Sequence, residues 1–140
     1  MTDREKTGEP VVSGDHVAPV GPVVPADHVT AVADLRAIVR QFVAERDWQH
    51  FHAPKNLAMA MAIETAELME HFQWMNVDES RGLVPGSSQW TAVAEELADV
   101  FCYALALANE LDIDLTSALR GKMRKNEEKY PVERYQGRYK

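Results

Sequence analysis

The stretch LAMAMAIETAELME, residues 57–70, contains seven successive apolar residues and then three carboxylates, of which the first two, Glu64 and Glu67, lie three positions apart. On a helix, residues three apart project from the same face. Burying such a pair without a counter-charge costs on the order of several kcal/mol. We therefore expect a helix over residues 55–74 whose carboxylates interact with a positively charged group or ion.

A second apolar stretch repeats the arrangement. EELADVFCYALALA, residues 95–108, carries Glu96 and Asp99 three positions apart, inside a predicted helix over 89–111. That helix is apolar on every side from Val100 to Ala108, apart from one tyrosine hydroxyl, so it needs neighbours all round. In a chain this small, a partner subunit would supply them.

Few cations can pair with these carboxylates, because Arg81 is the only Lys or Arg between Lys55 and Leu119. Two acidic pairs on neighbouring helices would converge on one anionic pocket, and Mg²⁺, or Mn²⁺ in its place, would relieve the repulsion there. A di-iron centre fits poorly, since it needs Glu-x-x-His motifs that these helices lack. The predicted metal-binding and catalytic residues are Glu64, Glu67, Glu96 and Asp99.

The other elements follow from periodicity and turn residues. Apolar residues recur at helical spacing over 29–48, and Asp114 is placed to cap a helix over 115–129. Residues 76–88 are rich in turn formers and read as a loop. With no convincing strand, the fold class is all-α: a four-helix bundle completed by oligomerisation, as a homodimer or homotetramer.

The 140 residues suit one domain. Residues 1–26 hold four of the seven prolines and show no periodicity, which is typical of a disordered arm or an expression remnant. We assign 27–131 to the domain and 132–140 to a C-terminal tail. No membrane-spanning run or signal peptide is evident and the lone Cys102 reads as core, so we expect a cytoplasmic protein.

Charge divides the chain into an acidic body and a basic end. Residues 27–118 hold five Lys or Arg against fifteen Asp or Glu, whereas residues 119–140 hold eight against three. The acidic body argues against binding a nucleic acid polymer. A basic helix beside an acidic cluster that can bind a metal ion is compatible with binding of a small polyphosphate. A basic helix face that is simply exposed to solvent would explain the same charge pattern.

Aromatic and basic residues add weaker signals. Each aromatic is also compatible with simple core packing, but Trp48, Trp74 and Tyr103 flank the acidic helices, where a base could stack. Lys55 and Asn56 lie at a helix N-terminus, which favours anions, and Lys122 and Asn126 share a face of the last helix. Together, these aromatic and basic residues suggest that the protein binds a nucleotide whose phosphates coordinate a metal ion. The alternative is a non-catalytic helical adaptor that binds a structural ion.

Three segments carry a resemblance to a known family: ERDWQHFHAPKNLAMAMAIETAELMEHFQW (45–74), EELADVFCYALALA (95–108) and GKMRKNEEKYP (121–131). They resemble the all-α nucleoside triphosphate pyrophosphohydrolases of the MazG superfamily, and most closely the dCTP pyrophosphatase branch. The resemblance implies hydrolysis of a nucleoside triphosphate to its monophosphate and pyrophosphate. It also implies a dimer or a dimer of dimers, with sites completed across subunits.

The resemblance also assigns residues. The family's ExxE and ExxD pairs, which hold Mg²⁺, match the four carboxylates named above. Base contacts match Trp48, Trp74, His52 and Tyr103, and phosphate and sugar contacts match Lys122 and Asn126. One position departs: animal dCTP pyrophosphatases carry a base-contacting histidine where this chain has Val39. The expected substrate is dCTP or a modified pyrimidine deoxynucleotide, whose base would find no polar partner at Val39.

Overall fold

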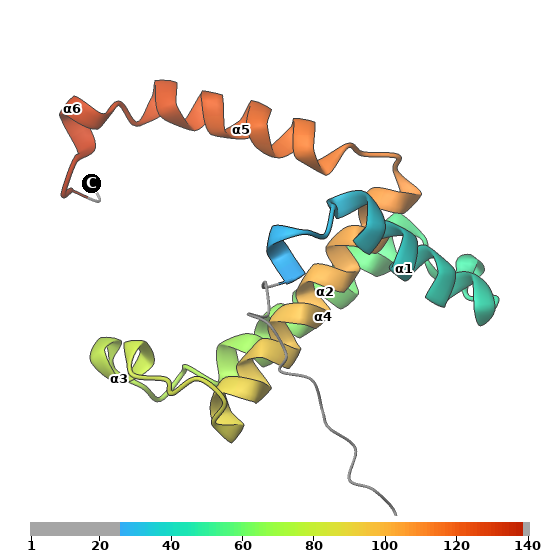
Figure 1. Ribbon diagram of the computed structural model, residues 1–140, viewed down its shortest axis with the longest axis horizontal. Coiled ribbons are helices and arrows are strands. Elements are labelled where there is room, and N and C mark those ends of the chain that lie inside the picture. The colour runs from blue at the N-terminus through green and yellow to red at the C-terminus, as the bar shows by residue number, and fades with distance from the viewer. Residues whose placement is uncertain (1–25, 139–140) are drawn as a thin grey trace, which may run out of the picture.

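The computed structural model describes residues 26–138, and this part of the chain contains helices and no strand (Figure 1). The prediction of an all-α fold is confirmed. The elements in chain order are η1 (Ala26–His28), α1 (Val32–Glu45), η2 (Gln49–Phe51), α2 (Pro54–Glu70), α3 (Val77–Arg81), α4 (Ser88–Glu110), α5 (Leu115–Lys129) and α6 (Val132–Tyr135).

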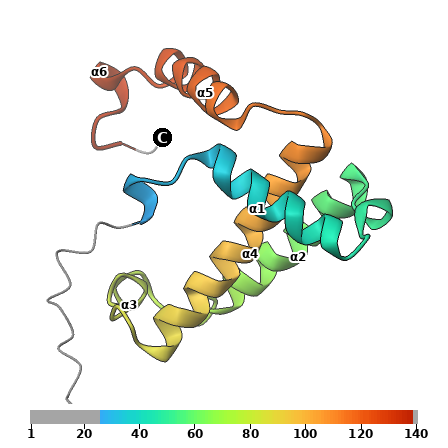
Figure 2. The same cartoon turned by 45° about the vertical axis from the view of Figure 1, so that its right-hand side comes forward.

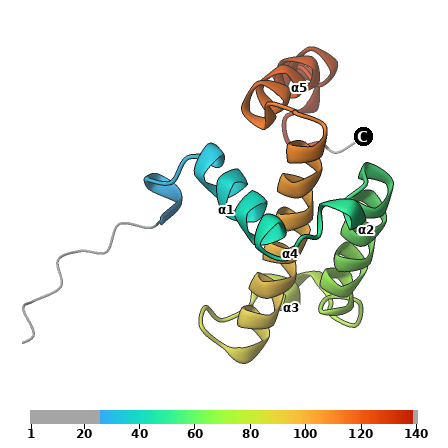
Figure 3. The same cartoon turned by 90° about the vertical axis from the view of Figure 1, so that its right-hand side faces the viewer.

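Three helices pack together. The closest packing is between α2 and α4, which run side by side in opposite directions, and α1 crosses α4 (Figures 1 and 3). The buried centre of this packing is formed by Val39 of α1, Leu57 of α2, and Leu105 and Ala106 of α4. The core therefore lies where the start of α2 meets the end of α4.

Helix α5 extends away from the other three (Figures 1 and 2). Its first residue, Leu115, packs against the core, but α5 has no extensive contact with α1, α2 or α4. Large apolar side chains on α2 and α4 also stay exposed, among them Met59, Ile63 and Leu97. The four-helix bundle is thus not closed within one chain, and its completion by oligomerisation stays a prediction.

Local sequence sets the helix ends. Pro54 opens α2, where its missing N–H is not needed. The side chain of Ser87 accepts a hydrogen bond from the Trp90 amide at the start of α4 (3.2 Å). Asp114 caps α5 as predicted, accepting from the amide of Ser117 at 3.0 Å, and these hydrogen bonds hold the pKa of Asp114 below its ordinary value.

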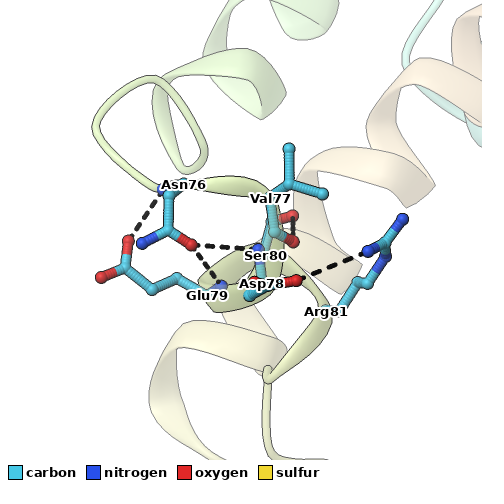
Figure 4. Close-up of polar contacts among 6 residues, drawn as sticks. All are labelled: Asn76, Val77, Asp78, Glu79, Ser80 and Arg81. Carbon is cyan, nitrogen blue, oxygen red and sulfur yellow. Dashed lines mark hydrogen bonds and ion pairs between the residues drawn. The ribbon is translucent and has the colours of Figure 1, made fainter.

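The prediction of a loop over 76–88 is wrong for its first half, which forms α3 (Figure 4). The Asn76 side chain accepts from the amides of Asp78 and Glu79, at 3.0 and 2.9 Å, while Glu79 accepts from the Asn76 amide at 2.8 Å. This reciprocal capping box stabilises a single helical turn that composition alone does not reveal. Helix α6 lies likewise within the predicted tail, and the predicted arm lies outside the described residues except for Ala26.

A polar clamp joins α1 to the end of α4. Arg36 donates to the Asn109 side chain (Nε to Oδ1, 2.9 Å) and to the carbonyls of Ala108 (3.1 Å) and Ile113 (3.0 Å). Asn109 returns a hydrogen bond to the Arg36 carbonyl at 3.0 Å. Because the C-terminal carbonyls of a helix lack partners and carry partial negative charge, an arginine is well suited to this position.

Replacing Arg36 with methionine (R36M) tests the clamp. The aliphatic stem remains, but two carbonyls and Asn109 lose a charged donor, so we expect the free energy of unfolding to fall by about 2–3 kcal/mol. Urea unfolding at a fixed protein concentration measures the change. R81M removes an exposed arginine whose only described ion pair is with Asp78, and it should cost less than about 0.5 kcal/mol. Equal stability of the two variants would contradict the clamp.

Candidate functional site

Packing of α2 against α4 brings the acidic pairs together. One carboxylate oxygen from each of Glu64, Glu96 and Asp99 lies within 4.8 Å of the others. Glu64 and Glu96 are half-buried and Asp99 is exposed, so the apolar stretches do not bury these side chains as the sequence suggested. Three converging carboxylates are a donor set that Mg²⁺ or Mn²⁺ prefers. These residues could hold a divalent cation.

The electrostatics of the cluster favour a cation. Partial burial raises the pKa of Glu64 above its ordinary value, and the negative charges of Glu67, Asp99 and Glu96 raise it further. The nearest carboxylates repel one another, and a divalent ion between them would remove that repulsion. The donor set and its charge therefore both fit a metal ion.

Glu67, the fourth predicted ligand, is not part of this three-residue group. Its side chain is exposed on α2, one turn after Glu64, although its charge acts on Glu64. The assignment of Glu67 as a ligand stays a prediction.

A cavity of about 620 Å³ opens beside the cluster, between α1, η2, α2 and α4. Most of its wall is apolar or aromatic, as in sites that bind a flat organic ligand. Three predicted base contacts, Trp48, His52 and Tyr103, lie in the wall, and so does Asn56, which was predicted to contact an anion. Val39, the position that departs from the animal enzymes, lies there too. The lining residues are Ile38, Val39, Phe42, Val43, Trp48, Phe51, His52, Asn56, Leu57, Ala60, Asp99, Cys102, Tyr103 and Ala106.

Asp99 joins the cavity to the acidic cluster, because it belongs to both. Tyr103, one turn further along α4, lines the same cavity, and partial burial followed by the negative charge of Glu64 raises its pKa. Its hydroxyl therefore stays protonated at neutral pH and can donate a hydrogen bond. A ligand in the cavity would meet both the phenol and the carboxylates.

Two polar side chains of the wall have one atom occupied and one free. His52 Nδ1 lies 2.8 Å from the Trp48 carbonyl, and Asn56 Nδ2 donates to the Phe51 carbonyl at 3.1 Å. Because a carbonyl only accepts, Nδ1 of His52 carries the proton, which leaves Nε2 as an acceptor in the neutral ring. Asn56 likewise retains its Oδ1. His52 Nε2 and Asn56 Oδ1 are thus free acceptors, and the second N–H of Asn56 Nδ2 is a free donor.

Four predicted contacts lie outside the cavity wall. Trp74 follows α2 with 89% of its surface exposed, and Lys55 is exposed at the start of α2. Lys122 and Asn126 lie on α5, which projects away from the cavity helices (Figure 2). Within one chain, neither Lys55 nor Lys122 therefore lines the cavity.

Sequence reasoning missed Phe42 as part of the wall. It was only one of the apolar residues at helical spacing in the helix predicted over 29–48, and it is half-exposed beside Trp48, with ring centroids 5.9 Å apart. Cys102 was predicted to be core and does pack against it, with a thiol pKa raised by burial, yet it also lines the cavity. Only the packing of α1 over α4 reveals that residues of one surface belong both to the core and to the cavity wall.

Comparisons with known proteins agree with this geometry. Residues 59–140 match the model of the MazG-like family. The chain is 42% identical over 104 residues to dCTP pyrophosphatase 1 of Mus musculus, covering 71% of this chain and 58% of that protein. The Bos taurus protein of the same name is 38% identical over 124 residues, covering 85% of this chain and 70% of that one.

Among solved structures, a pyrophosphatase from Archaeoglobus fulgidus superposes with a TM-score of 0.65 at 42% sequence identity, covering 71% of this chain and 91% of that chain. The fold and site thus define an all-helical protein with a carboxylate cluster opening onto an aromatic cavity. The chain belongs to the MazG-like family. It spans only a little over half the length of the mouse relative, 58%. No helix within residues 26–138 is both long and apolar enough to cross a membrane.

Metal binding can be measured directly by calorimetric titration with Mn²⁺ or Mg²⁺. E96Q and D99N each remove one charged ligand and should weaken binding by about tenfold or more, whereas E95Q changes the adjacent exposed residue and should bind as the unaltered protein does. Since the pKa of Glu64 is raised, protons compete with the ion more effectively, so affinity should fall on acidification and begin to fall at a higher pH than it would for a carboxylate of ordinary pKa. Unchanged affinity in both variants would remove the cluster as a metal site.

Proposed function

We propose that the protein hydrolyses a nucleoside triphosphate, dCTP or a modified pyrimidine deoxynucleotide, to its monophosphate and pyrophosphate, in the cytoplasm and with Mg²⁺. The observation that carries the proposal is the position of Asp99, which borders a cavity of about 620 Å³ and belongs to the carboxylate cluster. A base in the aromatic cavity would direct its phosphates toward that cluster. Membership of the MazG-like family and the names of the relatives support the same reaction.

The chain's own residues have separable roles in this proposal. Trp48, Phe42 and Tyr103 enclose the base, and stacking on aromatic rings stabilises any flat heterocycle. Glu64, Glu96 and Asp99 would hold Mg²⁺, which when bound would neutralise charge on the triphosphate and favour ionisation of water. Glu67 or Glu96 accepts the proton of the attacking water in this scheme.

A second copy of the chain would complete the site. The exposed apolar side chains of α2 and α4 and the projecting α5 suit a homodimer or homotetramer. Lys122, Asn126 and Lys55 would then supply phosphate and sugar contacts, and Trp74 would cover a base, each across the subunit boundary. The net-positive end of the chain, residues 119–140, complements the acidic body.

The free polar atoms of the cavity favour a base with an exocyclic amino group. With the proton on His52 Nδ1, Nε2 of that ring and Oδ1 of Asn56 are acceptors, so they can receive hydrogen bonds from the amino group of cytosine. A carbonyl at the same position, as in thymine, could accept only from the second N–H of Asn56 Nδ2 and would repel the two acceptors. This supports dCTP over dTTP even though Val39, which is 8% exposed in the wall, offers no polar contact.

The deciding experiment measures pyrophosphate release from a panel of canonical and modified nucleoside triphosphates with Mg²⁺. We expect release from dCTP, and E64Q, E67Q, E96Q and D99N should each lower kcat by about 100-fold or more while circular dichroism stays helical. E95Q is the matched control and should keep its activity. No release from any nucleotide, together with a lower melting temperature on chelation, would instead favour an adaptor with a structural ion.

The histidine that Val39 replaces can be restored. V39H should lower KM for dCTP relative to dTTP, because it adds a hydrogen-bonding ring to a wall that now has an isopropyl group there; discrimination should rise by about fivefold or more. V39L adds volume without polarity, so it distinguishes the effect of a hydrogen-bonding group from the effect of a larger side chain. The interpretation of this position is wrong if V39L and V39H shift the dCTP to dTTP ratio equally.

A further inference from the structure

We propose that Arg46 is a positioning residue for the aromatic wall of the cavity, acting through Phe42 and Trp48. The proposal rests on the proposed nucleotide substrate. Arg46 itself is not part of the cavity lining, whereas Phe42 and Trp48 both are. None of the metal or phosphate contacts considered above involves it.

The guanidinium of Arg46 lies against the Phe42 ring. Its Cζ is 3.6 Å from the centroid of that ring and 5.9 Å from the Trp48 ring. The same side chain donates from Nη1 to the Phe42 carbonyl at 3.0 Å, and Glu45 Oε2 lies 3.7 Å from that nitrogen. One cation thus contacts both the ring and the backbone of Phe42.

Local backbone geometry brings the second ring into the same group. Helix α1 ends at Glu45, and Asp47 takes a left-handed conformation with φ of 52°. The amides of Asp47 and Trp48 then donate to the carbonyls of Ala44 and Val43, both at 3.1 Å, which closes the helix end. This reversal sets Trp48 edge-on to Phe42, with an interplanar angle of 75°.

The two rings need such support because much of each is exposed, 47% for Phe42 and 42% for Trp48. A half-exposed ring keeps rotational freedom that a ligand must remove on binding. A planar cation over the ring face favours one orientation. The Arg46 contact therefore lowers the ordering cost of binding a base, an effect that appears in KM and not in the chemical step at the carboxylates.

The test is a mutant cycle read out by steady-state kinetics with dCTP. R46M should raise KM about two- to fivefold, the effect of removing one exposed cation–π interaction, and should leave kcat within about twofold of the unaltered protein. R46Q, which keeps a donor for the Phe42 carbonyl without a charge, should behave like R46M. R46K keeps a cation and should restore most of the affinity. If R46M does not fold, the comparison of R46Q with R46K takes its place.

The cycle decides whether Arg46 acts through Phe42. In an F42L background the R46M substitution should raise KM by less than about 1.5-fold, because no ring remains to be held. The matched control R81M removes the same charge from an exposed site and should leave KM unchanged, which excludes a general charge effect. An unaltered KM in R46M, an undiminished effect in F42L, or an R46K variant as impaired as R46M would each overturn the proposal.

Failure of the proposed function gives a different result. If the unaltered protein releases no pyrophosphate from any nucleotide, that function is wrong, and the same variants are compared by calorimetric titration with dCTP, where R46M should weaken binding by the same two- to fivefold factor. If the unaltered protein hydrolyses dCTP but KM does not respond to Arg46, only the Arg46 proposal fails. If it neither hydrolyses nor binds dCTP, both fail.

Discussion

The site depends on the packing of α2 against α4, which holds like charges close together. Leu57 and Leu105 are each 3% exposed at one end of this interface, and full burial of such a side chain contributes about 1.5–3 kcal/mol. Repulsion among exposed or half-buried carboxylates is weaker than that because solvent screens it. The helices can therefore present Glu64, Glu96 and Asp99 as a ready-made anionic group, at a cost that the core offsets.

How much of the fold and of the site the sequence predicts depends on how far apart along the chain the interacting residues lie. The cap at Asp114 depends on residues a few positions apart, so the sequence predicts it, and spacing alone identifies which carboxylates share a face. Helix ends were predicted less well: the helices expected over 29–48 and 55–74 are α1, Val32–Glu45, and α2, Pro54–Glu70, and the short helix α3 was missed. The register of α2 against α4 decides that Glu64 joins Glu96 while Glu67 lies apart, and no local pattern encodes that register. The same limit hid Phe42, whose spacing is equally suitable for a core and for a cavity wall.

The exposed apolar faces of α2 and α4 and the projecting helix α5 have a common physical explanation. Three packed helices bury only a small centre, and the remaining apolar surface of α2 and α4 exceeds what α1 can cover. Helix α5 carries much of the basic excess yet lies away from the acidic cluster of its own chain. If the proposed function holds, each copy would supply one sign of charge to the site of another, and nucleotide binding would depend on assembly.

Under the proposed function, selectivity for the base would depend on which hydrogen-bonding atoms the fold has already occupied. His52 and Asn56 each contribute one donor to a neighbouring carbonyl, at Trp48 and Phe51, and those hydrogen bonds shape the η2 turn. In the proposed function, His52 Nε2 and Asn56 Oδ1 remain as acceptors for a base amino group, and such acceptors discriminate against a base carbonyl more strongly than an apolar wall does. In the proposed function, the apolar side chain at Val39 would offer the base one polar partner fewer without removing the basis for preferring an amino group, because that preference would come from the hydrogen bonds of His52 and Asn56 to the Trp48 and Phe51 carbonyls.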